Sequence, residues 1–249
     1  MDTDGLLAVL DATVDAVAEA LAATDDWGPA GTRDGQYRSD LAADRAALGV
    51  LLGSGLGVLS EESGVTAGER SLLAVVDPLD GSTNAARGIP WFATSVCVLD
   101  EVGPLVAVVA DQARGRRWRA VRGEGATLDG KALRIPPAAE LGDAVVALSG
   151  LPPADPPWRQ TRILGAAALD LCAVAGGAVD GFIDCVADAH GGWDYLGGVL
   201  VCREAGGLVV DAAGRDLVVR SHRARRTPVA AAGPRLLEDL LAVRRRLPL

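Results

Sequence analysis

The chain has 249 residues, 49 % of them apolar, a formal charge of −9 at pH 7 and a pI of about 4.7. The negative charge argues against a nucleic-acid partner held by a general positive field, and the apolar content suffices for one large core or two closely packed halves. The N-terminal Met-Asp-Thr-Asp lacks the basic region of a signal peptide, and no apolar stretch approaches the ~20 residues of a membrane span. We therefore expect a soluble, cytoplasmic protein with neither nucleic-acid nor membrane partners.

The first half of the chain predicts two helices followed by a sheet. A helix is expected at 6–23, where Leu6, Leu10 and Val14 recur on one face, with Thr3 or Asp4 as its N-cap. Residues 26–38 are rich in turn formers and predict a loop before a second helix at 39–54. Strands are expected at 57–59, 72–76, 92–99, 105–110 and 117–121. The turns at 100–103 and 129–130 indicate hairpins, so this sheet is predicted to be largely antiparallel.

The second half alternates helices and strands. Residues 151–158 contain four prolines and mark either a boundary or a surface loop. Helices are then predicted at 166–175, 194–205 and 235–245, and strands at 180–186, 208–210 and 229–232. The pattern indicates an α+β half followed by an α/β half in stacked layers, which we divide into subdomains 1–135 and 136–249.

Cysteine and histidine usage speaks against a zinc enzyme. The four cysteines form no Cys-x-x-Cys pair and stand mostly in apolar runs, as is typical of small core residues in a reducing compartment. Only His190 and His222 could supply imidazole. The arginine clusters at 223–226 and 244–246 are interpreted as solvated faces rather than binding patches.

The most informative segment is Asp77-Pro78-Leu79-Asp80-Gly81-Ser82-Thr83-Asn84, directly after an apolar run. Its two carboxylates are predicted to point into one small volume beside a turn of free backbone N–H groups. Anionic oxygens next to N–H donors suit a hard divalent cation and a phosphate together. The alternative is an ordinary turn rich in Asp, Gly, Ser and Asn, which the complete eight-residue string makes the weaker interpretation.

Other acidic residues can be joined to this segment. Glu61-Glu62 follows a short predicted strand, Asp194 follows Trp193 at the start of a predicted helix, and Asp40 lies near the start of the second helix. Taken alone, Asp40 and Asp194 are better explained as N-caps, and Glu61-Glu62 as a solvated turn.

These motifs together change that judgement. Glu61-Glu62-Ser63, the segment 77–84, and Trp193-Asp194 followed by Glu204-Ala205-Gly206-Gly207 resemble the signatures of the inositol monophosphatase family. This is the magnesium-dependent, lithium-sensitive phosphatase superfamily that includes the fructose-1,6-bisphosphatases. The likeness extends to 89–92, 165–172 and 225–231, and so covers nearly the whole chain. It implies an α+β fold, a layered α-β-α-β-α sandwich with an antiparallel N-terminal sheet and a mixed α/β C-terminal half.

The resemblance also implies a role for each matching residue. Two or three Mg²⁺ ions are expected on five ligands, namely Glu61, Asp77, the Leu79 carbonyl, Asp80 and Asp194. Ser82 matches a hydroxyl that orients and deprotonates the attacking water, together with Glu61 and with Asp40 as its carboxylate partner. Asp44 is the rival of Asp40, which we prefer because its distance to Glu61 is nearer to the spacing in the family. The Gly81 and Ser82 N–H groups, at the start of a short helix, are expected to hold the phosphate.

The substrate is indicated less clearly. Asp80, Asp184 and Asp194 are expected on the substrate side, with Asp184 in place of a glutamate that binds sugar hydroxyls in the inositol enzymes. The segment 184–192 is longer than in those enzymes, and its Asp188 and His190 are interpreted as loop residues rather than pocket residues.

The expected function is that of a magnesium-dependent phosphomonoesterase. Its substrate would be inositol-1-phosphate or a related small polyol or sugar phosphate, hydrolysed by direct attack of a metal-activated water. Histidinol phosphate and fructose-1,6-bisphosphate are alternative substrates. A regulatory binding protein on the same fold is a further alternative, although every residue that the chemistry needs is present. A homodimer is expected from the family alone.

Overall fold

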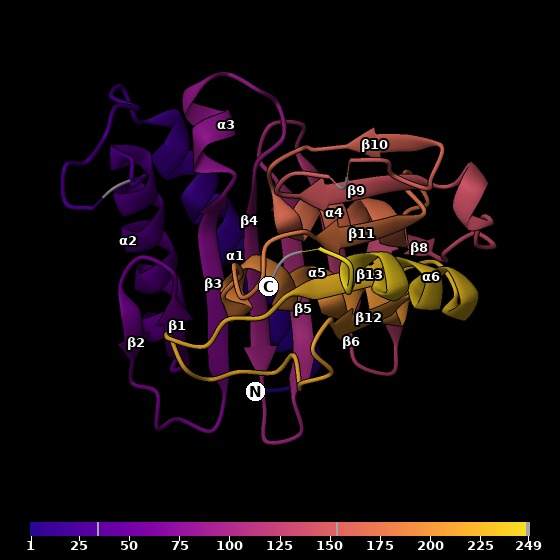
Figure 1. The fold of residues 1–249 in the computed structure, drawn as a ribbon. Helices are drawn as coiled ribbons and strands as arrows, with labels where there is room; N and C mark the ends of the chain where they lie inside the picture. Colours follow the sequence, from indigo (N-terminus) through magenta and orange to yellow (C-terminus); the bar gives the residue numbers. More distant parts are fainter. Residues whose placement is uncertain (34, 153, 248–249) are drawn as a thin grey trace.

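The computed structural model describes residues 1–33, 35–152 and 154–247. Its elements stack as helix, sheet, helix, sheet, helix (Figure 1), which confirms the predicted α-β-α-β-α sandwich. The outer helical layer consists of α1 (Thr3–Ala22) and α2 (Arg38–Gly53). The middle layer consists of α4 (Ala167–Ala175) and α5 (Gly192–Glu204), and α6 (Pro234–Arg244) covers the far side.

The first sheet is largely antiparallel, as predicted, with β1 and β3 as its parallel pair. Its spatial order is β2 (Gly64–Thr66), β1 (Gly57–Ser60), β3 (Leu73–Asp80), β4 (Ala93–Leu99), β5 (Pro104–Asp111), β6 (Arg116–Val121), β7 (Gly125–Leu128) and β8 (Lys131–Leu133). The short helix α3 (Ser82–Ala86) follows β3.

The second sheet is mixed. Its order is β10 (Gln160–Arg162), β9 (Val145–Ser149), β11 (Gly181–Asp184), β13 (Pro228–Ala231) and β12 (Leu208–Asp211). The strands β10, β9 and β11 run parallel to one another, and β13 is antiparallel to both its neighbours. A 3-10 helix at Leu141–Asp143 precedes β9.

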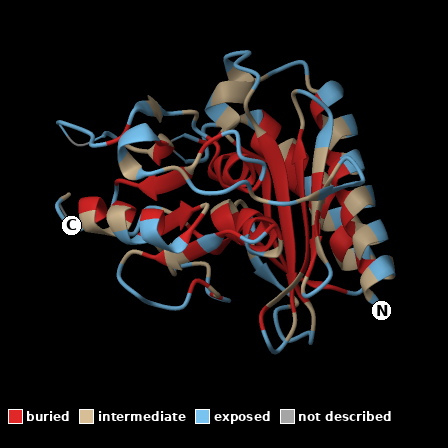
Figure 2. Ribbon diagram, turned by 90° about the vertical axis from the view of Figure 1, so that its right-hand side faces the viewer, coloured by how far each residue is buried: buried red, intermediate tan, exposed pale blue. Residues whose placement is uncertain are grey.

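Three apolar cores lie between the layers, so the central strands of the first sheet are buried on both faces (Figure 2). In β3, Leu73 and Val75 face the middle helices, whereas Ala74 and Val76 face α1 and α2. A strand that is buried on both faces needs apolar side chains at successive positions, and residues 72–76 form such an apolar run in the sequence. Because β3 is packed on both faces, its end holds the residues that follow in a fixed position.

The structure moves several predicted boundaries. The N-cap of α1 is Asp2, whose side chain accepts a hydrogen bond from the Gly5 N–H, rather than Thr3 or Asp4. The strand β3 continues to Asp80 instead of ending at residue 76, because a β-bulge lets it follow β4 past Asp77. The strands β2, β7, β8, β9 and β10 were not predicted. All five have five residues or fewer, too short for a clear period-2 pattern.

The two halves of the chain correspond to the two sheets, and the central core joins them. Their division into subdomains at residue 135 stays a prediction. The proline-rich segment 151–158 connects β9 to β10 within the second sheet, so its described residues form a surface loop; Pro153 lies outside the described residues. All four cysteines are buried and free, in agreement with their interpretation as core residues. In the described part of the chain, no helix combines the length and the apolar character needed to cross a membrane.

Candidate metal centre

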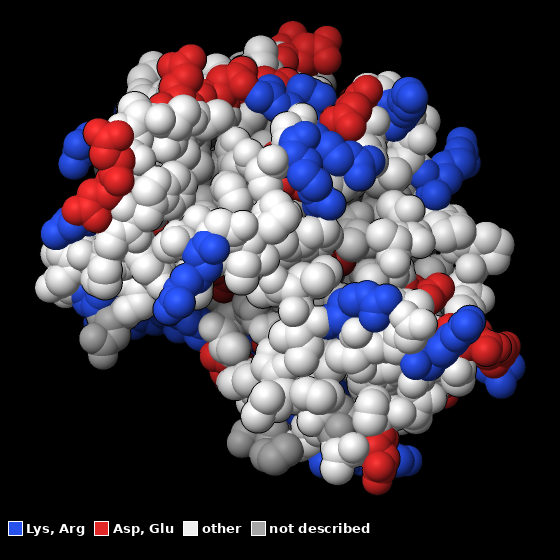
Figure 3. Space-filling model, turned by 90° about the horizontal axis from the view of Figure 1, so that it is seen from above, with Lys and Arg blue, Asp and Glu red and all other residues white. Residues whose placement is uncertain are grey.

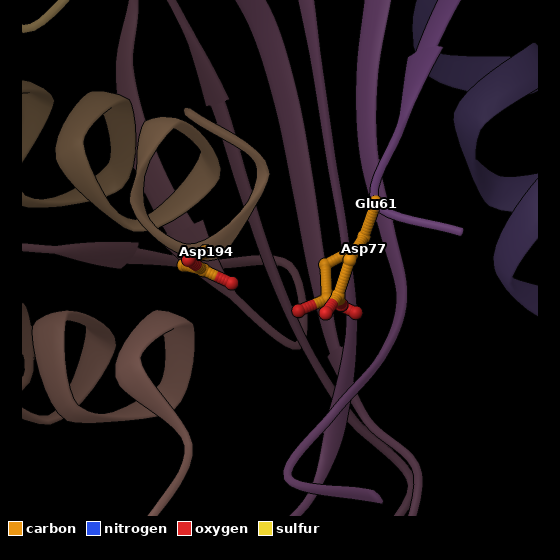
Figure 4. Close-up of side chains that lie close together, drawn as sticks. All are labelled: Glu61, Asp77 and Asp194. Atoms are coloured by element: carbon orange, nitrogen blue, oxygen red, sulfur yellow. The ribbon is translucent and has the colours of Figure 1, made fainter. Parts of the chain in front are cut away.

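Three carboxylates from two layers meet at one end of the first sheet. Glu61 directly follows β1, Asp77 lies in the neighbouring parallel strand β3, and Asp194 lies in the first turn of α5. Parallel pairing aligns Ser60 with Val76, which places Glu61 and Asp77 side by side. One ligand atom of each acid lies within 4.8 Å of the others, and Asp194 points from its helix toward the other two (Figure 4).

Asp80 joins the group through the bulge in β3. Pro78 and Leu79 lie opposite the single residue Thr94, between the pairs that Asp77 and Asp80 form with β4. One oxygen of Asp80 accepts a 2.7 Å hydrogen bond from the Ala168 N–H at the start of α4. The bulge therefore breaks the strand alternation between the two acids and ties the second one to the middle layer.

The pKa values show that these acids repel one another. Burial, together with the charges of Asp194 and Glu62, raises the pKa of Glu61 to about 8. Burial and neighbouring acids likewise raise the pKa of Asp77 and Asp80 well above their usual value. Buried like charges at this spacing are costly, and a divalent cation held between them relieves the repulsion. Oxygen donors from carboxylates fit a hard cation such as Mg²⁺.

Comparisons with known proteins identify the family of this chain. Residues 51–248 match the model of the inositol monophosphatase family. The chain belongs to the inositol monophosphatase family. It is 35 % identical over 205 residues to the Nus factor SuhB of Pasteurella multocida, covering 74 % of this chain and 72 % of that protein. It is 33 % identical over 207 residues to a fructose-1,6-bisphosphatase of Pyrococcus furiosus, covering 82 % and 81 %. A solved inositol monophosphatase from Anabaena superposes with a TM-score of 0.79 at 25 % identity, covering 98 % of each chain.

Asp40 and Ser82 lie next to the carboxylate cluster. One oxygen of the Asp40 carboxylate accepts the Tyr37 N–H at 2.8 Å, and the other, Oδ1, is buried without a hydrogen-bond partner among the described residues. The Ser82 side chain is close enough to lower the pKa of Asp40, but burial dominates and raises that pKa to about 6. Asp44 is engaged elsewhere, because it accepts hydrogen bonds from the hydroxyls of Ser60 and Ser63. This geometry favours Asp40 over Asp44 as the partner of Ser82.

Gly81 lies at a junction between the two halves of the chain. Its φ is +84°, and an added Cβ would lie 3.0 Å from the Trp91 carbonyl oxygen and 3.1 Å from that of Gly165. Glycine is therefore required here for both conformation and space. The Asn84 side chain spans the same junction and donates to the carbonyls of Trp91 and Leu164, each at 2.8 Å. These contacts fix the start of α3 beside the carboxylates.

Asp184, at the end of β11, is paired with His190. Asp184 is fully buried, and its two oxygens accept hydrogen bonds from the Val186 N–H at 3.0 Å and from Nδ1 of His190 at 2.7 Å. Each oxygen of Asp184 is thus engaged by a group of the protein, and substrate contact by Asp184 stays a prediction. The segment 184–192 folds His190 back over Asp184.

Residues 220–226 form a strap that joins the two halves at the metal centre. Nε2 of His222 lies 2.9 Å from the Glu61 carbonyl oxygen, and its ring stacks on Trp193 with centroids 4.7 Å apart. Arg225 covers the Trp193 ring at 4.9 Å and donates to the His222 carbonyl at 2.8 Å. The predicted arginine cluster at 223–226 is thus partly structural. The strap connects the backbone of one acid, Glu61, with the neighbour of another, Asp194.

Sequence reasoning missed His190, His222 and Ser149 as neighbours of the centre. Ser149 could have been found only from the pairing of the strands, because it lies opposite Asp184 at the carboxyl ends of two parallel strands. The two histidines come from loops, and local patterns do not place a loop against a distant element. Figure 3 shows this end of the molecule from above, where small areas of acidic atoms lie sunk between uncharged side chains near the middle.

Proposed function

We propose that this chain is a magnesium-dependent phosphomonoesterase that hydrolyses a small polyol or sugar phosphate. The observation that carries the proposal is the convergence of Glu61, Asp77 and Asp194 to within 4.8 Å, beside Asp40 and Ser82. Membership in a family that includes phosphatases supports the reaction class.

Each residue would then have a defined task. Glu61, Asp77, Asp80, Asp194 and the Leu79 carbonyl would hold the cations, whose charge would acidify the attacking water and stabilise the leaving oxygen. The Ser82 hydroxyl would orient that water, and Asp40 would accept the proton through Ser82. The N–H groups of Gly81 and Ser82, fixed beside the acids by the Asn84 contacts, would bind the phosphate oxygens.

Inositol-1-phosphate heads the proposed substrates, with fructose-1,6-bisphosphate and histidinol phosphate as alternatives. A relative named as a fructose-1,6-bisphosphatase, 33 % identical to this chain, supports the second of these. Ranking kcat/KM over the three substrates distinguishes them. We further propose a cytoplasmic homodimer, for which a mass of about twice 25.4 kDa in analytical ultracentrifugation is the expected result.

Phosphate release from this panel, with Mg²⁺ and with EDTA, tests the reaction. Wild type should turn over at least one substrate only with Mg²⁺. Asp77→Asn and Asp194→Asn should lower kcat/KM by about 100-fold or more, because each removes a charged ligand from the cluster. An inert wild type, or full activity in both variants, would refute the proposal.

A second candidate function rests on the names of several relatives. Proteins 34–36 % identical to this chain are named Nus factor SuhB, which supports a regulatory role on the same fold. Such a role would rely on partner contacts rather than on the carboxylates. Negligible turnover, together with partner capture in pull-downs that Asp80→Asn leaves unchanged, would favour it over the phosphatase.

A further inference from the structure

A serine, a histidine and an aspartate form a connected group on the C-terminal side of the metal centre. Ser149 and Asp184 are paired neighbours at the carboxyl ends of β9 and β11. His190 bridges them, with Nδ1 2.7 Å from Oδ2 of Asp184 and Nε2 3.4 Å from the Ser149 hydroxyl. Ser149 is half-buried, and the His190 side chain retains 13 % of its exposure, whereas that of Asp184 retains none.

The backbone holds this histidine firmly. The His190 N–H donates to the Arg226 carbonyl at 3.2 Å, and the Arg226 N–H donates back to the His190 carbonyl at 2.8 Å. Asp184 fixes the ring from the other side. A carboxylate buried this deeply needs a positive partner, so the pair favours the imidazolium form of His190. Asp184 is therefore a positioning residue for His190.

His190 also faces the metal centre. The N–H of the adjacent Gly191 donates to Oδ2 of Asp194 at 2.7 Å. Burial raises the pKa of Asp80 on β3, Asp170 on α4 and Asp194 on α5, and the charge of His190 offsets part of that rise. Burial lowers the pKa of His190, but the hydrogen bond to Asp184 and the charges of nearby acids outweigh burial and raise this pKa to about 9. The polar atoms that the C-terminal half offers here are thus an imidazolium N–H and a hydroxyl, whereas the carboxylate lies behind them.

We propose that His190, with Ser149 beside it, forms the leaving-group subsite and selects phosphate esters whose leaving group carries a second anionic group. This inference rests on the proposed phosphatase function and narrows its substrate. Donors recognise acceptor oxygens, and a charged donor forms the stronger hydrogen bond with an anion. An uncharged polyol such as inositol uses this subsite less well, and the cationic leaving group of histidinol phosphate is repelled.

A matched pair of substrates tests the subsite. Fructose 1,6-bisphosphate and fructose 1-phosphate share the ester at position 1 and differ in the second phosphate. With Mg²⁺ present, wild type should show a kcat/KM roughly 10-fold or more higher for the bisphosphate, the range of a hydrogen bond between charged groups. His190→Gln, which keeps a hydrogen-bonding amide but loses the charge, should bring this ratio close to 1.

Two further variants complete the experiment. Asp188→Asn changes an exposed charge on the same loop, one that pairs with Arg215, and should leave the ratio at its wild-type value. If His190→Gln fails to fold, Ser149→Ala tests the same subsite and should lower the ratio. A wild-type ratio near 1, or a ratio that neither substitution lowers, overturns the inference while phosphatase activity stands. Absence of Mg²⁺-dependent phosphate release from every substrate would instead refute the proposed function.

Discussion

Asp40 and Asp44 lie one helical turn apart on α2, yet their surroundings suit different tasks. Asp44 is tied to the turn after β1 by the hydroxyls of Ser60 and Ser63. Asp40 keeps one buried oxygen without a partner among the described residues, and it neighbours Ser82. A carboxylate with an available oxygen beside a hydroxyl can accept a proton, whereas Asp44 is held by two serine hydroxyls and stabilises the fold.

Substitutions at these positions separate the two roles. We expect Asp40→Asn and Ser82→Ala to lower kcat by about 100-fold, the lower end for losing general-base assistance, with little change in KM. Activity of the wild type should fall as pH drops below about 6, because Asp40 must be ionised to accept the proton. Steady-state kinetics from about pH 5 to about pH 9 measure both effects.

Asp44→Asn is the matched control on the same helix. It should lower thermal stability through its lost hydrogen bonds while leaving the acid limb of the pH profile in place. If Asp44→Asn abolished turnover and Asp40→Asn did not, the assignment of the two residues would be reversed.

At the scale of elements, the metal centre depends on a junction between layers. Glu61 and Asp77 belong to the first sheet, and Asp194 belongs to the middle helical layer. The strap 220–226 connects them through the contact of His222 with the Glu61 carbonyl and its stacking on Trp193. A residue that orients a ligand from outside the ligand set influences metal affinity without touching the metal.

Removing this connection should weaken Mg²⁺ binding. We expect His222→Ala to raise the Mg²⁺ concentration for half-maximal thermal stabilisation by about 10- to 100-fold, the effect typical of outer ligand partners. The kcat at saturating Mg²⁺ should change little, because His222 contacts Glu61 only through its backbone carbonyl. Thermal melts over a Mg²⁺ series provide the measurement.

The conservative variant His222→Gln serves as the control, since its amide N–H can still donate to the Glu61 carbonyl. It should keep the Mg²⁺ midpoint closer to that of wild type than His222→Ala does. Equal midpoints in all three proteins would show that the strap does not position Glu61.

At the scale of the whole molecule, the carboxylates link folding to pH and to metal. The pKa of Glu61 is about 8 in the folded protein against an ordinary value of 4.5, so the folded state binds more protons than the unfolded state in this window. The free energy of unfolding of the metal-free protein therefore falls as pH rises from 4.5 to 8. Asp77 contributes in the same direction.

Two thermal melts test this linkage. In EDTA, the Tm should be lower at pH 8 than at pH 6, and Mg²⁺ should remove most of the difference. Asp77→Asn should raise the Tm of the metal-free protein at pH 8, by roughly 2–4 °C for each kcal/mol of repulsion relieved, and should reduce the Mg²⁺ effect. A metal-free Tm that rises from pH 6 to pH 8 would contradict the pKa shifts.

The order of helices and strands was largely predictable because it depends on local patterns. The apolar faces of α1 and the doubly buried run of β3 repeat within a few residues and need no knowledge of distant partners. The short strands β9 and β10 were not predictable in this way, since three to five residues gain their structure from the strands beside them.

The sequence by itself determined the family and predicted the chemistry of the site, because Asp77, Asp80, Gly81 and Ser82 stand in one short segment whose motif resembles that family. Only the tertiary structure decided which side chains surround it. Asp184 lies behind His190, Asp44 is engaged by serines, and His222 reaches Glu61 across 161 positions of sequence. The physical reason is that hydrogen bonds form between atoms that folding brings together. The number of residues between two positions in the sequence does not predict whether their atoms will meet.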